Sequence, residues 1–273
     1  MGRGPESKSC EQINYFYPKE YFDAQIVVAS KIKELGLSPN VQSAILNYTV
    51  IYRHLVGKNP TKQGPDPEWV DFVKTIPEKS LLANHVWSMY TKKEHSIYKL
   101  KENQINSFGS FIYKTSVNKK TEEQEIELHF NNQRRGQIKS DFSRKYVYER
   151  VTDLTNLFQS IYDRKTKDPI FNPKKVILVS WMNNLPGVRE SLPKLFIGSE
   201  TTVKPPNLNF RSNSLWGQFL TNQGNIHIDR FVKLQNNIRQ AKNINEIVDS
   251  FPIQVKSFES DIEVFFSNYN IKI

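Results

Sequence analysis

The order of strand-like and helix-like segments between residues 125 and 196 constrains the fold of this chain most strongly. Ile126, Leu128 and Phe130 alternate with polar residues, which is the period of a half-buried strand. A long helical pattern follows, and Val176–Val179 is then a continuous apolar run typical of a strand covered on both faces. This order predicts a β-α-β unit whose two strands run parallel.

The connecting helix has the clearest periodicity in the chain. Its apolar residues recur at spacings of four, three, four and three. We expect the helix to begin near Ser140, whose hydroxyl can cap it, with Asp141 well placed at the positive end of the helix dipole. The apolar face consists of Val147, Val151, Leu154, Phe158 and Ile161.

Three portions are expected along the chain. Residues 1–18 form a flexible head, residues 19–105 a helical portion, and residues 106–273 an α/β portion. The expected fold class is α+β or α/β, in which the helical N-terminal portion packs on a C-terminal portion that contains a small mixed sheet and one β-α-β unit.

Local signals place helices inside the helical portion. Gly36 is suited to end a first helix, and Ser38-Pro39 combines an N-cap with proline at the first helical position. One apolar stripe then continues to Gly57, which predicts a single second helix. Asp66-Pro67 repeats the cap-and-proline signal. The tail near Phe265 is expected to pack back as a last helix.

The net charge suggests an anionic partner. The chain has 273 residues, enough to bury a sizeable core, and its 38 Lys and Arg exceed its 28 Asp and Glu by ten charges. Such a surface attracts nucleic acids and phosphorylated ligands. The alternative interpretation is a basic surface that only contacts solvent.

Cysteine content and hydropathy favour a soluble, cytoplasmic protein. The one cysteine, Cys10, excludes an internal disulfide and a thiolate zinc site, and a reducing compartment fits best. No apolar run approaches the roughly 20 residues that a membrane span needs. The first residues also lack the apolar core of a signal peptide.

Polar residues that leave the first predicted strand form one half of a candidate site. In open α/β sheets, ligands bind at the carboxyl ends of the strands. His129 could serve in acid–base catalysis, although its alternation equally predicts a solvent-facing side chain. Arginines suit phosphate or carboxylate, and a helix start can bind an anion. The ligand-binding candidates in this loop are Asn131, Arg134, Arg135 and Ser140.

Residues that leave the second predicted strand form the other half. Trp181 could stack on a flat ligand, and carboxamides could orient it. Core packing for the tryptophan and turn formation for the asparagines are the simpler alternatives. The candidates in this loop are Ser180, Trp181, Asn183 and Arg189.

Several common chemistries lack their motifs. The chain has no Gly-x-Gly-x-x-Gly fingerprint and no phosphate-binding P-loop motif, so dinucleotide and P-loop sites are not expected, and no cofactor is predicted. Ser180 is not in a nucleophile elbow. His227 and Asp229 alternate like residues on one face of a strand, but two ligands are too few for a metal site, and none is predicted.

Three blocks, Ser180–Asn184, Leu192–Phe196 and Asn209–Leu220, give the second half of the chain a resemblance. They are similar to a set of uncharacterised bacterial proteins with Ser-Trp-Leu, Leu-Phe-Pro and Trp-Gly-Gln-Phe-Leu blocks, although Ile197 stands in place of the proline. The resemblance implies no activity. It implies that Trp181, Arg211, Trp216 and Gln218 belong to one unit with the edge of the β-α-β motif.

Three functions are consistent with these patterns. The first is a site for a phosphorylated or carboxylate small molecule at the strand ends, with or without catalysis. The second is nucleic-acid binding through the basic surface. The third is an interaction module in which the aromatic residues are core. The sequence does not indicate an oligomeric state.

Overall fold

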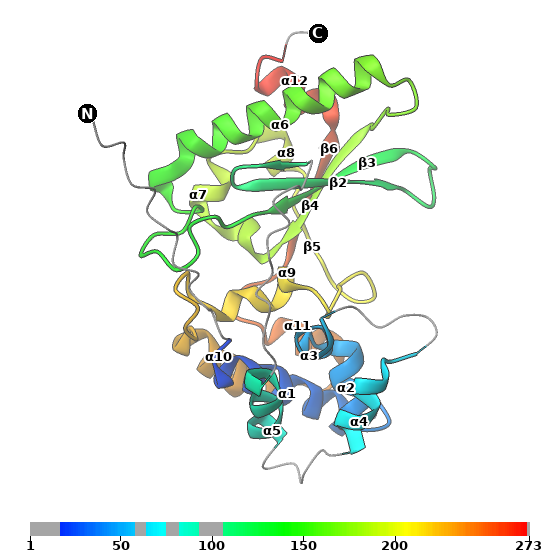
Figure 1. Cartoon of the computed structure of the whole chain (residues 1–273), viewed down its shortest axis with the longest axis vertical. Coiled ribbons are helices and arrows are strands. Elements are labelled where there is room, and N and C mark those ends of the chain that lie inside the picture. The colour runs from blue at the N-terminus through cyan, green and yellow to red at the C-terminus, as the bar shows by residue number, and fades with distance from the viewer. Residues whose placement is uncertain (1–16, 58–63, 75–81, 93–105, 272–273) are drawn as a thin grey trace, which may run out of the picture.

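The computed structural model describes residues 17–57, 64–74, 82–92 and 106–271. Within these ranges the chain forms two stacked layers, a sheet with its covering helices above a layer of helices (Figure 1). Most of the predicted head, including Cys10, lies outside the described residues. The predicted combination of helices with a small mixed sheet is confirmed.

The upper layer contains a six-stranded sheet in the order β1-β2-β3-β4-β6-β5. Only β3 and β4 pair in parallel, and the other neighbours are antiparallel. Its strands are β1 (Ser107–Phe108), β2 (Phe111–Val117), β3 (Gln124–Phe130), β4 (Lys175–Ser180), β5 (Thr201–Thr202) and β6 (Lys256–Asp261).

The predicted β-α-β unit is confirmed. Ile126 of β3 lies opposite Val176 of β4 in parallel register, and α6 (Val147–Lys167) connects the two strands. Both strands therefore end at the same edge of the sheet, and the segments after Phe130 and after Ser180 leave from that edge.

One face of the sheet is packed against α6 and α12 (Ile262–Asn268). Leu154, Phe158 and Ile161 of α6 have no exposed surface, as the helical spacing predicts. Phe158 stacks on Phe265 of α12 with the ring centroids 4.3 Å apart. This helix pair covers Ile126 and Val176, which belong to the same buried cluster.

The opposite face of the sheet is partly open. Val179 of β4 is 39% exposed, and Ile177 is only partly buried. The prediction that β4 is covered on both faces is therefore wrong. Polar residues such as Glu259, on the neighbouring antiparallel strand, share this face with Ile177, so β4 behaves like a strand of a one-sided sheet.

The lower layer is assembled from two distant parts of the chain. It contains α1 (Lys19–Glu34), α2 (Val41–Tyr48), α3 (Ile51–Val56), α4 (Pro67–Lys74) and α5 (Leu82–Lys92). Buried residues between Leu208 and Val255 join the same apolar cluster. The predicted boundary at residue 105 stays a prediction, and the cluster shows that the helical layer draws on both sides of it.

The predicted second helix is broken in two. Thr49 is extended (φ −137°, ψ 172°), so α2 ends at Tyr48 and α3 starts at Ile51. The fully buried Gln25 of α1 accepts the backbone N–H of Val50 at 3.0 Å, which stabilises the break. The N-cap of α2 is Asn40, not the predicted Ser38, because its carboxamide oxygen accepts the N–H of Ser43.

Short helices follow the β-α-β unit and lead between the layers. None of the described helices is long and apolar enough to cross a membrane. The remaining helices are η2 (Arg144–Tyr146), η3 (Trp181–Asn184), α7 (Pro186–Arg189), α8 (Lys194–Gly198), α9 (Asn213–Trp216), η4 (Gly217–Phe219), α10 (Ile228–Ile238) and α11 (Ile244–Asp249).

We expect Gly187→Ala to destabilise the fold. A Cβ at Gly187 would lie 2.5 Å from the carbonyl oxygen of Phe142, a backbone atom that cannot move aside cheaply. Such overpacking costs about 1–3 kcal/mol of unfolding free energy. Gly198→Ala is the matched control, because nothing lies within 4 Å of its Cβ position. Urea denaturation of both variants should separate them, and equal stabilities would contradict the close packing of α7.

Candidate functional site

The segment after β3, residues 131–146, is held in place by its own polar side chains. Asn131 Nδ2 donates to the carbonyl oxygen of Gly109 at 3.1 Å and to the hydroxyl of Ser107 at 3.3 Å. Asn131 therefore fastens this segment to the β1–β2 connection and does not point toward an open site.

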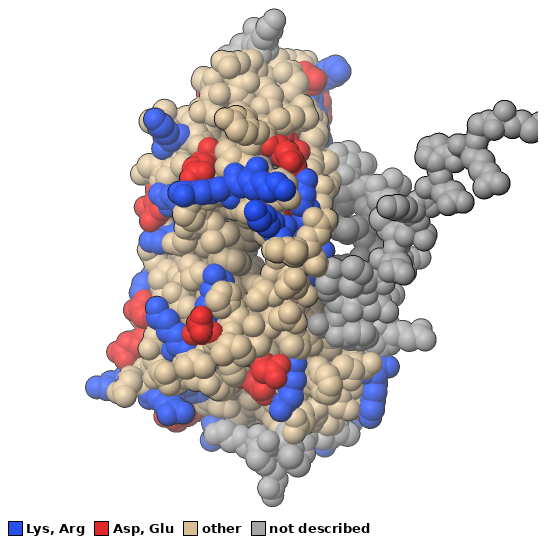
Figure 2. All heavy atoms as spheres, turned by 90° about the vertical axis from the view of Figure 1, so that its left-hand side faces the viewer, with Lys and Arg blue, Asp and Glu red and all other residues tan. Residues whose placement is uncertain are grey.

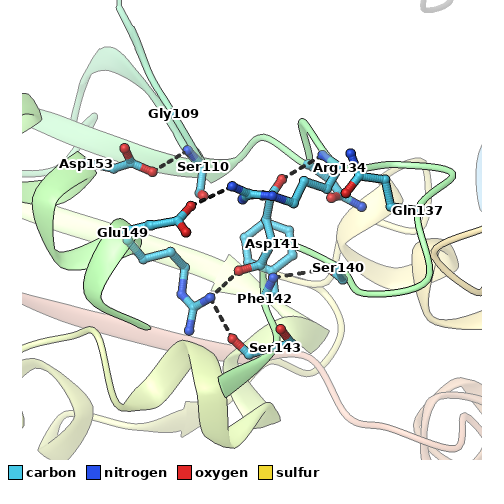
Figure 3. A network of polar contacts seen from close by, with 12 residues as sticks. Gly109, Ser110, Arg134, Gln137, Ser140, Asp141, Phe142, Ser143, Glu149 and Asp153 are labelled. Atoms are coloured by element: carbon cyan, nitrogen blue, oxygen red, sulfur yellow. Dashed lines mark hydrogen bonds and ion pairs between the residues drawn. The ribbon is translucent and has the colours of Figure 1, made fainter. Parts of the chain in front are cut away.

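Arg134 is engaged in two ion pairs (Figure 3). Its guanidinium binds the carboxylate of Asp141, which is 1% exposed, and the carboxylate of Glu149 at 2.5 Å. The backbone N–H of Arg134 also donates to Asp141 at 2.9 Å. Because two carboxylates already neutralise this cation, Arg134 is better suited to order the segment than to bind a ligand.

The helix after this segment does not begin at Ser140. Ser140 only accepts the N–H of Phe142 in a turn, η2 intervenes, and α6 starts at Val147 without a side-chain cap. The expected helix start near Ser140 is therefore wrong, and ligand binding by Ser140 stays a prediction. The cause is Asp141, whose carboxylate is used by Arg134 and does not face the helix dipole.

A buried cation holds the start of α6. Arg150 has no exposed surface, and its guanidinium donates to the carbonyl oxygens of Asp141, Ser143 and Gly187. Burial lowers the pKa of Arg150 below its usual value, and nearby carboxylates oppose the effect. These neutral acceptors fix residues 141–143 against α7.

The segment after β4 is also rich in structural hydrogen bonds. Ser180 caps η3 by accepting the N–H of Met182. Asn183 is fully buried and donates to the carbonyl oxygens of Leu178 (2.9 Å) and Lys256 (2.8 Å). Arg189 pairs with Glu200 at 2.5 Å. Hydrogen bonds from Arg189 and Lys256 lower the pKa of Glu200.

Asn222 joins the two layers. Its carboxamide accepts from Asn132 Nδ2 at 2.6 Å and donates to the carbonyl oxygens of Arg134 (2.8 Å) and Gln137 (2.7 Å). Its own carbonyl oxygen accepts the N–H of Gly136 at 2.7 Å. Four hydrogen bonds thus fix residues 131–137 on the turn that precedes α10.

Trp181 lies at this junction, beside the Trp-Gly-Gln block of α9 and η4. The guanidinium carbon of Arg230 is 5.3 Å from the centre of a Trp181 ring, a cation–π contact. A Cβ at Gly217 would lie 3.2 Å from Trp181 Nε1. Trp216 is fully buried, and Gln218, also buried, bonds the backbone of Leu215 and Ile253. The structure therefore brings Trp181, Trp216 and Gln218 together.

Arg230 differs from the other arginines at this edge. It is partly buried, and its Nη1 donates to the carbonyl oxygen of Gln218 at 2.6 Å. Burial lowers its pKa below the usual value, and no carboxylate of the described residues compensates its charge. A guanidinium has five N–H donors, so several remain for a ligand. A partly buried cation of this kind favours an anion beside it.

His227 is a second group that the sequence patterns did not assign to this site. It precedes α10, where Asp229 lies in the first turn, so the predicted strand across these two residues is wrong. Burial lowers the pKa of His227, the charge of Arg230 lowers it further, and Asp229 opposes both. The imidazole is therefore neutral near pH 7 and lies within electrostatic reach of Arg230.

The surface around this junction is basic and hollowed. Residues 131–146 and α10 lie on the left of Figure 1. Figure 2 shows that side, where Lys and Arg side chains gather on the upper layer above a hollow between the layers. Within residues 131–146, Lys139 and Lys145 are exposed. We name Trp181, His227 and Arg230 the junction site.

Three predicted residues lie apart from the junction site. His129 projects from the open face of the sheet, where its Nε2 is 3.7 Å from Glu127. Burial, then Lys114, lowers the pKa of His129, and Glu127 opposes them. Arg135 reaches the ring of Tyr17 at 5.3 Å. Arg211 lines an open groove of about 510 Å³ between α2 and residues 205–210.

Comparisons with known proteins assign no function to this site. No protein-family model, curated protein or solved structure matches the chain. In the part of the chain that the structure describes, no three His, Cys, Asp or Glu side chains are grouped to hold a metal ion.

We expect Asn222→Ala to loosen the contact between the layers. The substitution removes three side-chain hydrogen bonds, each of which contributes about 0.5–1.5 kcal/mol to stability. The unfolding free energy in urea should fall by roughly 2–4 kcal/mol. Gln223→Ala, at the exposed neighbouring position, should change it little. If both variants unfold at the same urea concentration, Asn222 does not hold the layers together.

Proposed function

We propose that the protein binds an anionic ligand, through a phosphate or carboxylate group, at the junction site. The observation that carries the proposal is Arg230, a partly buried guanidinium without a carboxylate partner among the described residues. The protein keeps this cation at the edge where β3 and β4 end, the edge at which ligands of α/β sheets are usually found.

The surroundings of Arg230 are suited to orienting such a ligand. The side chain is held by Gln218 and by the ring of Trp181, so its fork of donors is fixed before the ligand arrives. Guanidinium groups bind phosphate and carboxylate in a planar, bidentate manner. Trp181 and the Trp216–Gln218 block, which the family resemblance singled out, then serve as supports of the arginine.

Exchanging Arg230 tests the proposal. In differential scanning fluorimetry, inorganic phosphate or citrate should raise the melting temperature of the wild type, and the increase should be smaller in Arg230→Gln. The loss of a charged hydrogen bond of about 1.5–3 kcal/mol corresponds to roughly 10- to 150-fold weaker binding. Arg239→Gln is the control, because Arg239 is exposed at the end of the same helix.

The result also separates anion binding from nucleic-acid binding. The exposed cations Lys139 and Lys145, together with Tyr148, which is 87% exposed, favour a polyanion as the alternative ligand. If oligonucleotides bind with a steep salt dependence that Arg230→Gln leaves unchanged, and phosphate has no effect on either protein, the nucleic-acid alternative replaces the junction site.

The affinity for the anion should depend on pH through His227. An anion at Arg230 offsets the charge that lowers the pKa of His227, so the ligand-bound protein holds its proton more tightly. Sulfate, whose charge is constant in this range, should therefore bind several-fold more tightly as the pH falls from about 7.5 to about 5.5, across the usual pKa of histidine.

Calorimetric titration of sulfate at several pH values measures this linkage. His227→Gln should flatten the dependence, whereas His129→Gln, on the open face of the sheet, should preserve it. An unchanged slope in His227→Gln would show that another group takes up the proton.

A further inference from the structure

A second arginine without a partner lies in the helical layer. Arg53 is on α3 and is partly buried. Its Nε and Nη2 atoms are buried and have no hydrogen-bond partner. Native proteins rarely leave buried donors without an acceptor, and a charged group without one is especially unfavourable.

Aromatic rings gather at the start of α1 and contact His54, the residue that follows Arg53. Tyr17 stacks on Tyr21 at 4.8 Å and lies 4.3 Å from the ring of His54, the residue next to Arg53. Tyr21 is 1% exposed. The rings exclude water on one side, which strengthens any electrostatic interaction made there.

Arg135 brings a second cation to the same place. Residues 131–137, which Asn222 fixes on the helical layer, carry its guanidinium to 5.3 Å from the Tyr17 ring. Burial raises the pKa of Tyr21, and the positive charges of Arg53 and Arg135 oppose this shift. Both guanidinium groups therefore lie within electrostatic reach of one tyrosine.

We infer that Arg53, Arg135 and the Tyr17–Tyr21 rings form a second anion-binding site, distinct from the junction site. Its ligand carries a phosphate or carboxylate group that accepts hydrogen bonds from Nε and Nη2 of Arg53. A water molecule can accept these hydrogen bonds but carries no charge to offset that of Arg53, so an anion is the better occupant.

The inference does not depend on Arg230. The two arginines lie on different helices, Arg53 on α3 and Arg230 on α10. Arg53 should therefore still bind its ligand when Arg230 is exchanged. Arg230 should likewise still bind its ligand when Arg53 is exchanged.

Calorimetric titration with inorganic phosphate and with acetate tests the site in four full-length proteins. These are the wild type, Arg53→Met, Arg230→Gln and the double variant. We expect two phosphate equivalents for the wild type, one for each single variant and none for the double variant. Acetate in place of phosphate shows whether a carboxylate suffices. Arg53→Lys, which keeps the charge but loses the fork, should bind at least tenfold more weakly than wild type at this site.

A second measurement identifies the site directly and controls for folding. The Nε–H resonance of Arg53 in ¹H–¹⁵N spectra should shift with phosphate in both the wild type and Arg230→Gln. Without anion, Arg53→Met should melt no lower than the wild type, because an unpaired buried charge has been removed.

An Arg53 resonance that does not shift with phosphate, or two phosphate equivalents bound by Arg53→Met, would overturn the inference and leave the junction site unaffected. Loss of one equivalent in Arg53→Met with none lost in Arg230→Gln would reject the junction site alone.

Discussion

The parallel pairing of β3 with β4 determines where the polar segments of this protein meet. Because the two strands run in the same direction, with Ile126 opposite Val176, residues 131–146 and η3 must leave the sheet at one edge. The helical layer lies below that edge (Figure 1), and Asn222 connects it to residues 131–137. The positions of Trp181, Arg230 and Arg135 all follow from this arrangement. With an antiparallel pairing, the two segments would leave at opposite ends of the sheet and could not share a surface.

Four buried or partly buried arginines differ in the number of partners that their guanidinium groups have, and the contrast supports the two proposed anion sites. Arg134 is bound by two carboxylates, and Arg150 is surrounded by backbone carbonyl oxygens. Both have enough internal partners, so a structural role explains them. Arg230 has one carbonyl acceptor and an aromatic ring, and Arg53 leaves two buried nitrogens without an acceptor. Burying positive charge with so few acceptors is unfavourable, which makes these two positions the ones where an external anion would stabilise the protein most.

Hydrophobic periodicity in the sequence predicts the helices and strands that bury one face. It predicts little of the junction site. The spacing along α6 and the alternation in β3 predict these two elements because their apolar residues, such as Phe158 and Leu128, belong to the core. Strand β6 was not predicted, because Phe258 is its only fully buried residue. The predicted helix start at Ser140 is wrong because Asp141 is engaged in an ion pair with Arg134. Trp181 was identified as a candidate, but Arg230, about fifty residues further along the chain, carries no local pattern that distinguishes it from a surface arginine.

The path of the chain through the lower layer affects the cooperativity of unfolding. The chain leaves the sheet after β5, contributes α9, α10 and α11 to the helical cluster, and returns as β6. Two strands of one sheet thus bracket a large share of the other layer's core, so neither layer is a contiguous piece of polypeptide. Truncation before residue 106 would strip the partners of Leu234 and Ile247 and leave apolar surface uncovered. We therefore expect the two layers to unfold together rather than as independent domains.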